Sequence, residues 1–391
     1  MRSGYTIPQV VPVLLIMVLL IGNSPADQQQ SMQRFAIMML TGLKAAGVPA
    51  KAVFPPPFFG RIRFAGRFAG KWLGYIDKFV FFPRQLQQKL RSGVDLVHIC
   101  DHSNAMYAAQ VENVPVVVTC HDLLAVRGAR GEVADCPASP TGKYLQRWIV
   151  SGLRKASTVV CASVATLRDA ERIVVQADGR PPCVVIPHGQ NYPYRKQPTE
   201  IARTHLSRIP QLDPSRPFVL QVGSNSRMKN REGGLRMFAL TKNDWPAQMV
   251  FAGEKLTPAL RSLGQELGVT DRLIEVEEPS NELLEALYSS ALVLLHPSRF
   301  EGFGWPIIEA QACGCPVICS DREPMSDVGG NAALTGDVAD ENAMARAILR
   351  LTDPTERARW SEKSLRNAER FQVSEMIARY VALYRSLGVK I

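Results

Sequence analysis

The sequence lacks several of the patterns that assign a chain to a specialised class. Its eight cysteines include no C-x-x-C pair, so no zinc or disulfide spacing is present. Several of them lie inside apolar runs such as 97–100 and 117–120, which indicates buried free thiols in a reducing, cytoplasmic compartment. Low-complexity tracts and internal repeats are also missing. At 391 residues, 46% hydrophobic and 21% charged, the composition is that of a globular protein, and the length predicts two domains.

Long hydrophobic runs are scarce too. Residues 10–21 form an apolar run of twelve, which is shorter than the roughly 20 residues of an ordinary membrane span. With Arg2 ahead of it, the run could be the apolar part of a signal peptide. Alternatively, it is a buried parallel strand that ends in the turn at 22–24. An amphipathic helical pattern over 35–43 favours the strand, because a βα unit requires such a helix next.

The charge is uneven along the chain. The formal net charge is +10, and the window 51–91, with nine basic residues and one acid, accounts for eight of those charges. The remaining 350 residues are nearly neutral. A charge this local argues against nucleic-acid binding by the whole surface and needs a local explanation.

A basic and aromatic segment, residues 61–82, provides that explanation. On a helix, its basic residues occupy one flank and its aromatic residues the adjoining flank, as in helices that lie on a membrane surface. Gly66, Gly70 and Gly74 weaken the helix by roughly 1 kcal/mol each. Three interpretations stay open: a core helix with a solvated basic edge, contact with a membrane or a lipid-linked acceptor, and an anionic soluble acceptor.

Short apolar runs alternate with helical patterns along the whole chain. This alternation predicts an α/β protein with parallel sheets covered by helices on both faces. A polar, proline-containing stretch divides the runs into two series, which predicts two Rossmann-like domains facing each other across a cleft. The expected parts are an N-terminal, acceptor-side domain (1–190), a linker (191–217), a C-terminal domain (218–370) and a last helix that packs back toward the N-terminal domain (371–391).

The strongest local signal follows the apolar run 292–295. Gly302 and Gly304 predict a loop whose backbone can approach a ligand closely. Pro306 is placed to begin a helix and Gly314 to end it. A loop that leads into a helix N-terminus favours an anion such as a diphosphate.

Two carboxylates, Glu301 and Glu309, lie eight residues apart in this segment, one in the loop and one inside the helix. At a cleft, such carboxylates can accept hydrogen bonds from sugar hydroxyls. Two solvated surface acids are the alternative, but the surrounding Gly-Phe-Gly and the proline favour a site. His98 and His102 flank another apolar run and could line the acceptor side, or be structural.

Residues 297–316 resemble the E-x7-E signature of retaining glycosyltransferases of family 4, which have the GT-B fold. The resemblance covers nearly the whole chain. It extends to the phosphate-binding loop (222–230), a T-x-H-D segment (119–122), an I-P-N-G-like segment (185–189) and an L-P-E-V-G-G-like turn (326–330).

The resemblance implies a role for each matching residue. Glu301 binds the donor sugar and supports charge at the anomeric carbon, while His121 lies under that sugar. Lys229 and Arg227 neutralise the diphosphate leaving group. The resemblance also implies that backbone groups of Gly302, Phe303 and Gly304 contact the sugar and the diphosphate. Glu309 is expected to bind the ribose of the donor.

The sequence departs from this family at two places. Ser224 stands where an arginine is common, five residues before the phosphate-loop lysine, and the first loop (22–27) has no Gly-Gly pair. The sequence contains no D-x-D, so it offers no candidate for the metal-binding motif of the other large glycosyltransferase fold. We therefore expect no metal and no cofactor, with Lys229 and the helix N-terminus in the metal's place.

The expected function is transfer of a sugar, with retention, from a UDP- or GDP-sugar to an acceptor glycan or lipid-linked glycan. We therefore expect a role in cell-surface polysaccharide or glycolipid synthesis. The expected location of the protein is the cytoplasm or the inner face of the membrane. A nucleotide-sugar epimerase or phosphorylase on the same fold, and a catalytically silent sugar-binding subunit, are the alternatives.

Overall fold

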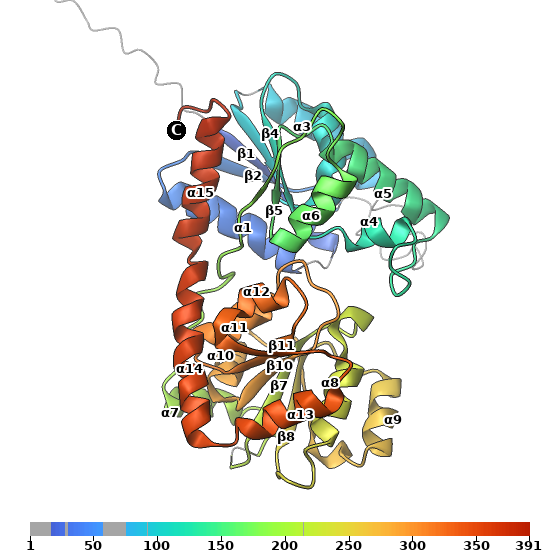
Figure 1. Ribbon diagram of the computed structural model, residues 1–391. Helices are drawn as coiled ribbons and strands as arrows, with labels where there is room; N and C mark the ends of the chain where they lie inside the picture. The colour runs from blue at the N-terminus through green and yellow to red at the C-terminus, as the bar shows by residue number, and fades with distance from the viewer. Residues whose placement is uncertain (1–16, 28–29, 58–75, 92, 214) are drawn as a thin grey trace, which may run out of the picture.

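The computed structural model describes residues 17–27, 30–57, 76–91, 93–213 and 215–391. Within them the chain forms two α/β halves, one above the other in Figure 1. Residues 10–16 of the first apolar run, and residues 61–75 of the basic and aromatic segment, lie outside the described residues.

The first half is built on a parallel sheet of six strands in the order β2-β1-β3-β4-β5-β6. Continuous apolar stretches such as Val116–Cys120 form its central strands, because both faces of a parallel sheet are covered. The strands are β1 (Val18–Ile21), β2 (Ala50–Val53), β3 (Leu96–Ile99), β4 (Val116–Cys120), β5 (Thr158–Cys161) and β6 (Cys183–Val185). The helices are α1 (Gln30–Ala45), α3 (Phe82–Leu90), α4 (Leu124–Ala129), α5 (Pro140–Leu153) and α6 (Val164–Ile173).

The strand interpretation of the N-terminal apolar run is confirmed for its last four residues. Val18–Ile21 is buried and lies between β2 and β3, with parallel pairing on both sides. The amphipathic helix expected next is α1, which buries Phe35, Met39 and Leu43.

The second half repeats the plan with the strand order β12-β11-β10-β7-β8-β9, again all parallel. Its strands are β7 (Phe218–Gly223), β8 (Gln248–Gly253), β9 (Leu273–Glu277), β10 (Val293–His296), β11 (Val317–Ser320) and β12 (Ala333–Gly336). Its helices are α7 (Thr199–Leu206), α8 (Arg231–Ala239), α9 (Pro258–Glu266), α10 (Asn281–Ser290), α11 (Trp305–Ala312), α12 (Met325–Gly329), α13 (Glu341–Arg350) and α14 (Pro354–Ala368).

The segment 191–217, predicted as a linker, contains helix α7. This helix packs on α10 of the second half. The Glu285 carboxylate of α10 accepts from the backbone N–H of Arg195 at 2.9 Å and from the Gln197 side chain at 2.7 Å. Much of the segment is therefore fixed to the second half.

The last helix, α15 (Val373–Ser386), follows α14 along one side of the molecule and lies against α1 of the first half (Figure 1). Its Tyr384 hydroxyl bonds Nδ1 of His98 at 2.7 Å, and its Tyr380 hydroxyl bonds Thr119 Oγ1 at 2.9 Å. The chain thus crosses from the second half back to the first sheet.

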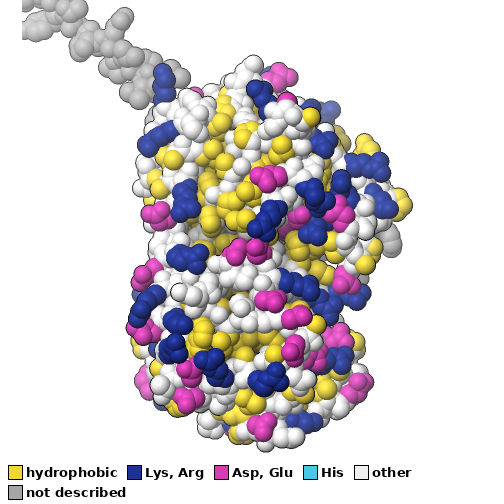
Figure 2. All heavy atoms as spheres, viewed as in Figure 1, with side chains coloured by type: hydrophobic (Ala, Val, Ile, Leu, Met, Phe, Trp, Pro, Cys, Tyr) yellow, Lys and Arg dark blue, Asp and Glu magenta, His cyan; other side chains and the backbone are white. Residues whose placement is uncertain are grey.

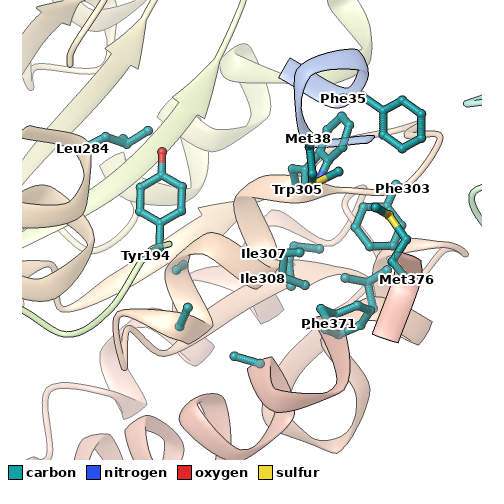
Figure 3. Packing of buried hydrophobic residues seen from close by; sticks show 14 of the residues in the cluster. Phe35, Met38, Tyr194, Leu284, Phe303, Trp305, Ile307, Ile308, Phe371 and Met376 are labelled. Carbon is teal, nitrogen blue, oxygen red and sulfur yellow. The ribbon is translucent and has the colours of Figure 1, made fainter. Parts of the chain in front are cut away.

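One apolar cluster joins the two halves. Figure 3 shows Phe35 and Met38 of α1 beside Trp305 and Phe303 of the second half, with Met376 of α15 next to them. Two further clusters fill the other faces of the sheets, one in each half. The halves therefore meet over buried side chains close to the predicted site. Among the described residues, no helix has the length and apolar character needed to cross a membrane.

Candidate functional site

The loop after β10 carries Glu301 and the glycines of the predicted site. It runs from Pro297 to Gly304, and helix α11 begins at Trp305 with Pro306 as its second residue. Gly304 caps the helix with a φ of 101°, a left-handed conformation that favours glycine. The loop therefore places Glu301 directly before a helix N-terminus, whose N–H groups favour an anion.

Glu301 forms the centre of a charged cluster. Its Oε1 accepts from Lys229 Nζ at 2.6 Å and from Ser298 Oγ at 2.8 Å, and lies 3.1 Å from His296 Nε2. Burial raises the pKa of Glu301, but the Lys229 ammonium and the His296 hydrogen bond outweigh burial and hold the pKa well below its usual range. The carboxylate is therefore ionised at neutral pH.

Lys229 reaches Glu301 from the loop after β7, the strand that pairs with β10, and it lies 72 residues earlier in the chain. It ends a 3-10 turn (Arg227–Lys229) that follows β7, and Asn230 then takes a left-handed conformation and caps α8. The Glu301 loop is also bonded to this turn, since Arg299 N–H donates to the Met228 carbonyl at 2.7 Å. The structure thus brings two predicted site residues into direct contact.

Glu309 lies inside α11 and is buried. Its Oε1 accepts from Asn191 Nδ2 and its Oε2 from the Tyr288 hydroxyl, both at 2.8 Å. Burial raises its pKa, although both hydrogen bonds act in the opposite direction. Ribose binding by Glu309 stays a prediction. In this structure, the two carboxylate oxygens of Glu309 link Asn191 to Tyr288 of α10.

Arg227 reaches toward the first half. Its guanidinium is 3.2 Å from Asp135 Oδ1, and Arg299 of the Glu301 loop is 3.9 Å from Asp135 Oδ2. Asp135 belongs to the segment between α4 and α5. An acidic residue of one half thus pairs with the two arginines that flank the site on the other half.

Gly302 lies in close contact with the first half. A Cβ at this position would lie 2.1 Å from the His121 carbonyl oxygen, so only glycine fits. The Gly302 carbonyl also accepts from Thr166 Oγ1 at 3.5 Å. Phe303, next in the loop, is buried against the rings of His188 and Phe371.

His121 lies beside this loop as one member of a buried histidine pair. Its Nε2 is 2.8 Å from the Cys100 carbonyl and so carries a proton, which leaves Nδ1 to accept from His188 Nε2 at 2.9 Å. Burial lowers the pKa of both rings. Both are therefore neutral at pH 7. Both nitrogens of His121 are occupied, and its contact with a donor sugar stays a prediction.

The two histidines predicted for the acceptor side have different surroundings. His98 is fully buried, with Nε2 on Thr119 Oγ1 and Nδ1 on the Tyr384 hydroxyl, both at 2.7 Å. It has no free nitrogen for an acceptor and instead joins β3 to α15. His102 is 3.2 Å from Asp101, whose carboxylate raises the pKa of His102 despite its burial.

The sequence interpretation missed three features of the site. Asn23 of the first loop donates to Asp101 at 2.5 Å, which ties that loop to the end of β3. Trp305 stacks on His188 with ring centres 4.7 Å apart and donates to the Gly189 carbonyl. Arg231 is buried and bonded to Gly223 and Asn225 of the loop after β7. The sequence motifs covered Asn23 in the first loop, Trp305 in the E-x7-E segment and His188 in the I-P-N-G-like segment, but predicted no contact for any of them, and Arg231 lay just outside the resembling loop 222–230. Within the described residues, no three His, Cys, Asp or Glu side chains are grouped to hold a metal ion.

Comparisons with known proteins identify the family of this chain. Residues 202–366 match the family described as glycosyl transferases group 1, and residues 32–192 match glycosyltransferase family 4. The chain is 35% identical over 108 residues to O-antigen chain mannosyltransferase B of Escherichia coli, covering 27% of this chain and 28% of that protein. It is 26% identical over 288 residues to D-inositol 3-phosphate glycosyltransferase of Acidothermus cellulolyticus, covering 71% of this chain and 63% of that protein.

Solved structures share the fold at low identity. Sucrose-phosphate synthase of Thermosynechococcus elongatus superposes with a TM-score of 0.73 at 22% identity, over 95% of this chain and 99% of that one. Anabaena Alr3699/HepE, solved in complex with UDP, superposes with a TM-score of 0.70 at 15% identity, over 95% and 100%. The predicted GT-B fold is thereby confirmed. With its two halves matched by the two family descriptions, the chain belongs to the group 1 and family 4 glycosyltransferases.

Proposed function

We propose that this chain transfers a sugar from a nucleoside-diphosphate donor to an acceptor hydroxyl, with retention at the anomeric carbon and without a metal ion. The observation that carries the proposal is the 2.6 Å contact of Lys229 with an ionised Glu301, directly before the N-terminus of α11. A cation, a carboxylate and a helix dipole within one small region fit a diphosphate and a sugar bound side by side.

The chemistry follows from where charge develops. As the bond to the anomeric carbon breaks, negative charge builds on the diphosphate and positive charge on the sugar ring. Lys229 and the α11 N–H groups neutralise the first charge, while the Glu301 carboxylate binds sugar hydroxyls and supports the second. In the absence of a donor, Lys229 and Glu301 neutralise each other, which keeps both ions in place inside a largely buried site.

We propose UDP- and GDP-sugars as the donors to test first. UDP is suggested by the Anabaena neighbour, and mannosyl transfer by the name of the Escherichia coli relative. Thermal-shift screening with both diphosphates and their sugars identifies the donor, because a ligand at 100 times its Kd stabilises by about 2.7 kcal/mol.

Product analysis with the identified donor separates the alternatives. Transfer gives nucleoside diphosphate and a glycosylated acceptor in equal amounts, with the donor's anomeric configuration in the product. A phosphorylase gives a sugar 1-phosphate, an epimerase gives a second nucleotide sugar, and a silent subunit gives binding without turnover. Any of these three results would replace the proposal.

We also propose that the acceptor is presented at an anionic membrane surface on the cytoplasmic side. The described part of the basic and aromatic segment exposes Ile76, Val80 and Phe81, each more than 40% accessible. On neighbouring α5, Tyr144 and Trp148 are exposed, and Trp148 contacts Phe79 with ring centres 4.9 Å apart.

The charges of this surface also support contact with an anionic membrane. Residues 82–91 and 140–155 contain seven Lys and Arg and no acid. Figure 2 shows Lys and Arg side chains gathered where Figure 1 places α5 and α6. Aromatic groups beside cations are typical of proteins that lie on anionic lipid.

Flotation with vesicles containing phosphatidylglycerol tests this contact. We expect the wild type to float with the vesicles. A triple variant of the proposed surface should not float with them; its changes are Arg84→Glu, Lys143→Glu and Arg147→Glu. A control triple variant on α14 should float like the wild type; its changes are Arg357→Glu, Arg359→Glu and Lys363→Glu. Equal flotation of all three proteins would refute docking by this surface.

A further inference from the structure

Arg231 lies directly beneath the phosphate-binding loop, where the sequence motif gave it no role. It is the first residue of α8, and only 3% of it is exposed. Its guanidinium rests over the Phe251 ring at 5.4 Å. Burial lowers its pKa to about 10, although Glu254 and Glu275 favour the charged form, so the group is a cation at neutral pH.

The guanidinium fork binds four neutral oxygens from two adjoining segments, 223–225 and 252–254. Nη2 donates to the carbonyl of Gly223, at the end of β7, at 2.5 Å, and to that of Ala252, in β8, at 3.3 Å. Nη1 donates to the Glu254 carbonyl at 2.6 Å and to Asn225 Oδ1 at 2.8 Å. Among the residues that the structure describes, no carboxylate accepts from it, and its charge is balanced there by carbonyl dipoles and by acids farther away.

These bonds fix the loop that carries Lys229. Gly223 has a φ of 138°, and the Lys229 side chain lies across it, since a Cβ there would be 3.3 Å from Lys229 Cδ and Cε. Arg231 thus binds the carbonyl of Gly223, and the Lys229 side chain packs against the same residue. Asn225, bonded to Arg231, also donates its backbone N–H to the Glu254 carboxylate at 2.8 Å.

We propose that Arg231 is a positioning residue for diphosphate binding, which holds the loop 223–229 so that Lys229 and the loop N–H groups face the diphosphate. The inference rests on the proposed function. The carbonyls that end β7 and β8 would otherwise present partial negative charge at this edge of the sheet. By binding them, the guanidinium lowers the electrostatic cost of an anion above the loop. Ser224 leaves the loop itself without an arginine at the position where the resembled family commonly has one.

The test compares a ligand that has the diphosphate with one that lacks it. The wild type is titrated first with UDP and GDP by calorimetry, and the diphosphate that binds is compared with its own nucleoside. The variants are Arg231→Met, Arg231→Lys and the control Arg236→Met, which removes an exposed arginine of the same helix that pairs with Glu232. Binding of neither UDP nor GDP to the wild type would contradict the proposed function itself.

We expect Arg231→Met to weaken nucleoside-diphosphate binding at least tenfold and to leave nucleoside binding within twofold. Arg231→Lys keeps the charge without the fork and should lose less, while Arg236→Met should match the wild type. Equal losses for the diphosphate and the nucleoside would show a merely structural role and overturn the proposal, as would an unchanged diphosphate affinity. Should Arg231→Met fail to fold, the same ratio measured on Arg231→Lys decides.

Discussion

At the scale of single residues, the site is governed by the Glu301 and Lys229 pair. The carboxylate lies in a buried environment, which by itself would favour its neutral form. A cation at 2.6 Å and hydrogen bonds from Ser298 and His296 reverse that preference. A negative and a positive charge thereby lie within one hydrogen bond of each other, and we propose that the first binds the sugar and the second the diphosphate.

The depressed pKa of Glu301 predicts how its stabilising effect depends on pH. A carboxyl whose folded pKa lies below the unfolded value of about 4.3 stabilises the fold above that pH, and this stabilisation is lost as the pH falls toward the folded pKa. We therefore expect the melting temperature of Glu301→Gln to lie below that of the wild type at pH 7 and to approach it as the pH falls below about 4.

Melting curves of both proteins between pH 7 and pH 3 check this expectation. Glu277→Gln, which breaks an exposed pair with Lys255, serves as the control and should stay close to the wild type at pH 7, because exposed ion pairs stabilise by about 0–1 kcal/mol. A Glu301→Gln deficit that grows in acid would contradict the assigned ionisation.

At the scale of elements, two contacts place the site between the halves. The Glu301 loop lies against the first half at Gly302, and α15 returns to the first sheet through Tyr380 and Tyr384. Each contact is made by groups that a single substitution can remove or block. Each therefore predicts a separate experimental effect.

Gly302→Ala tests the close approach of the loop to His121. A methyl group 2.1 Å from the His121 carbonyl oxygen cannot be accommodated, so the loop or the halves must move apart. We expect turnover to fall at least tenfold while each half stays folded, as judged by circular dichroism. Normal turnover of this variant would mean that the halves do not approach this closely in the working enzyme.

Tyr384→Phe tests the attachment of α15. The change leaves Nδ1 of the fully buried His98 without its 2.7 Å partner, which costs about 1–3 kcal/mol of unfolding free energy. Tyr144→Phe is the matched control, because Tyr144 is 72% exposed and its loss should cost little. Equal stabilities of the two variants in urea denaturation would refute the structural role given to His98.

At the scale of the whole molecule, the two halves face each other across a site that is bridged by exposed ion pairs. Asp135 of the first half pairs with Arg227 and Arg299, and Arg168 pairs with Glu323 at another point of the boundary. Arg227 cannot pair with Asp135 and approach a diphosphate at the same time. The family resemblance predicts that Arg227 binds the diphosphate, and on that prediction we propose that Asp135 competes with the donor for this arginine.

Asp135→Asn removes that competition. Because the pair is exposed and worth at most about 1 kcal/mol, we expect nucleoside-diphosphate binding to tighten by up to about fivefold at low salt, and by less at high salt. Calorimetric titration at two salt concentrations measures the effect. Glu323→Gln breaks the other bridge without touching Arg227 and should leave the affinity unchanged; a similar gain there would point to general loosening of the halves.

Much of this architecture could be predicted from the sequence. Continuous apolar runs predicted the central strands, such as 114–119 and 292–295, because a strand buried on both faces leaves that pattern. Edge strands β2 and β12, with the short sequences AKAV and ALTG, carry too weak a pattern and were missed. Helix α7 was missed inside a polar stretch because its stability comes from packing on α10.

The site was predictable where a local motif encodes it. The E-x7-E segment and the phosphate loop gave Glu301 and Lys229. Contacts between distant residues were not predictable, since nothing local shows that His98 would meet Tyr384, 286 residues later. Arg231 was missed for the same reason, because its partners lie at the ends of two strands.

The most direct test of the account is the rate of nucleoside-diphosphate release, with donor and acceptor present, for Glu301→Gln and Lys229→Met against the wild type. Removing one such group typically costs ~10²–10³ in rate. Glu277→Gln and Lys255→Met, the exposed pair of the same half, are the matched controls. The account predicts losses of that size for the first pair of variants and wild-type rates for the controls; near-wild-type turnover in Glu301→Gln and Lys229→Met would contradict it.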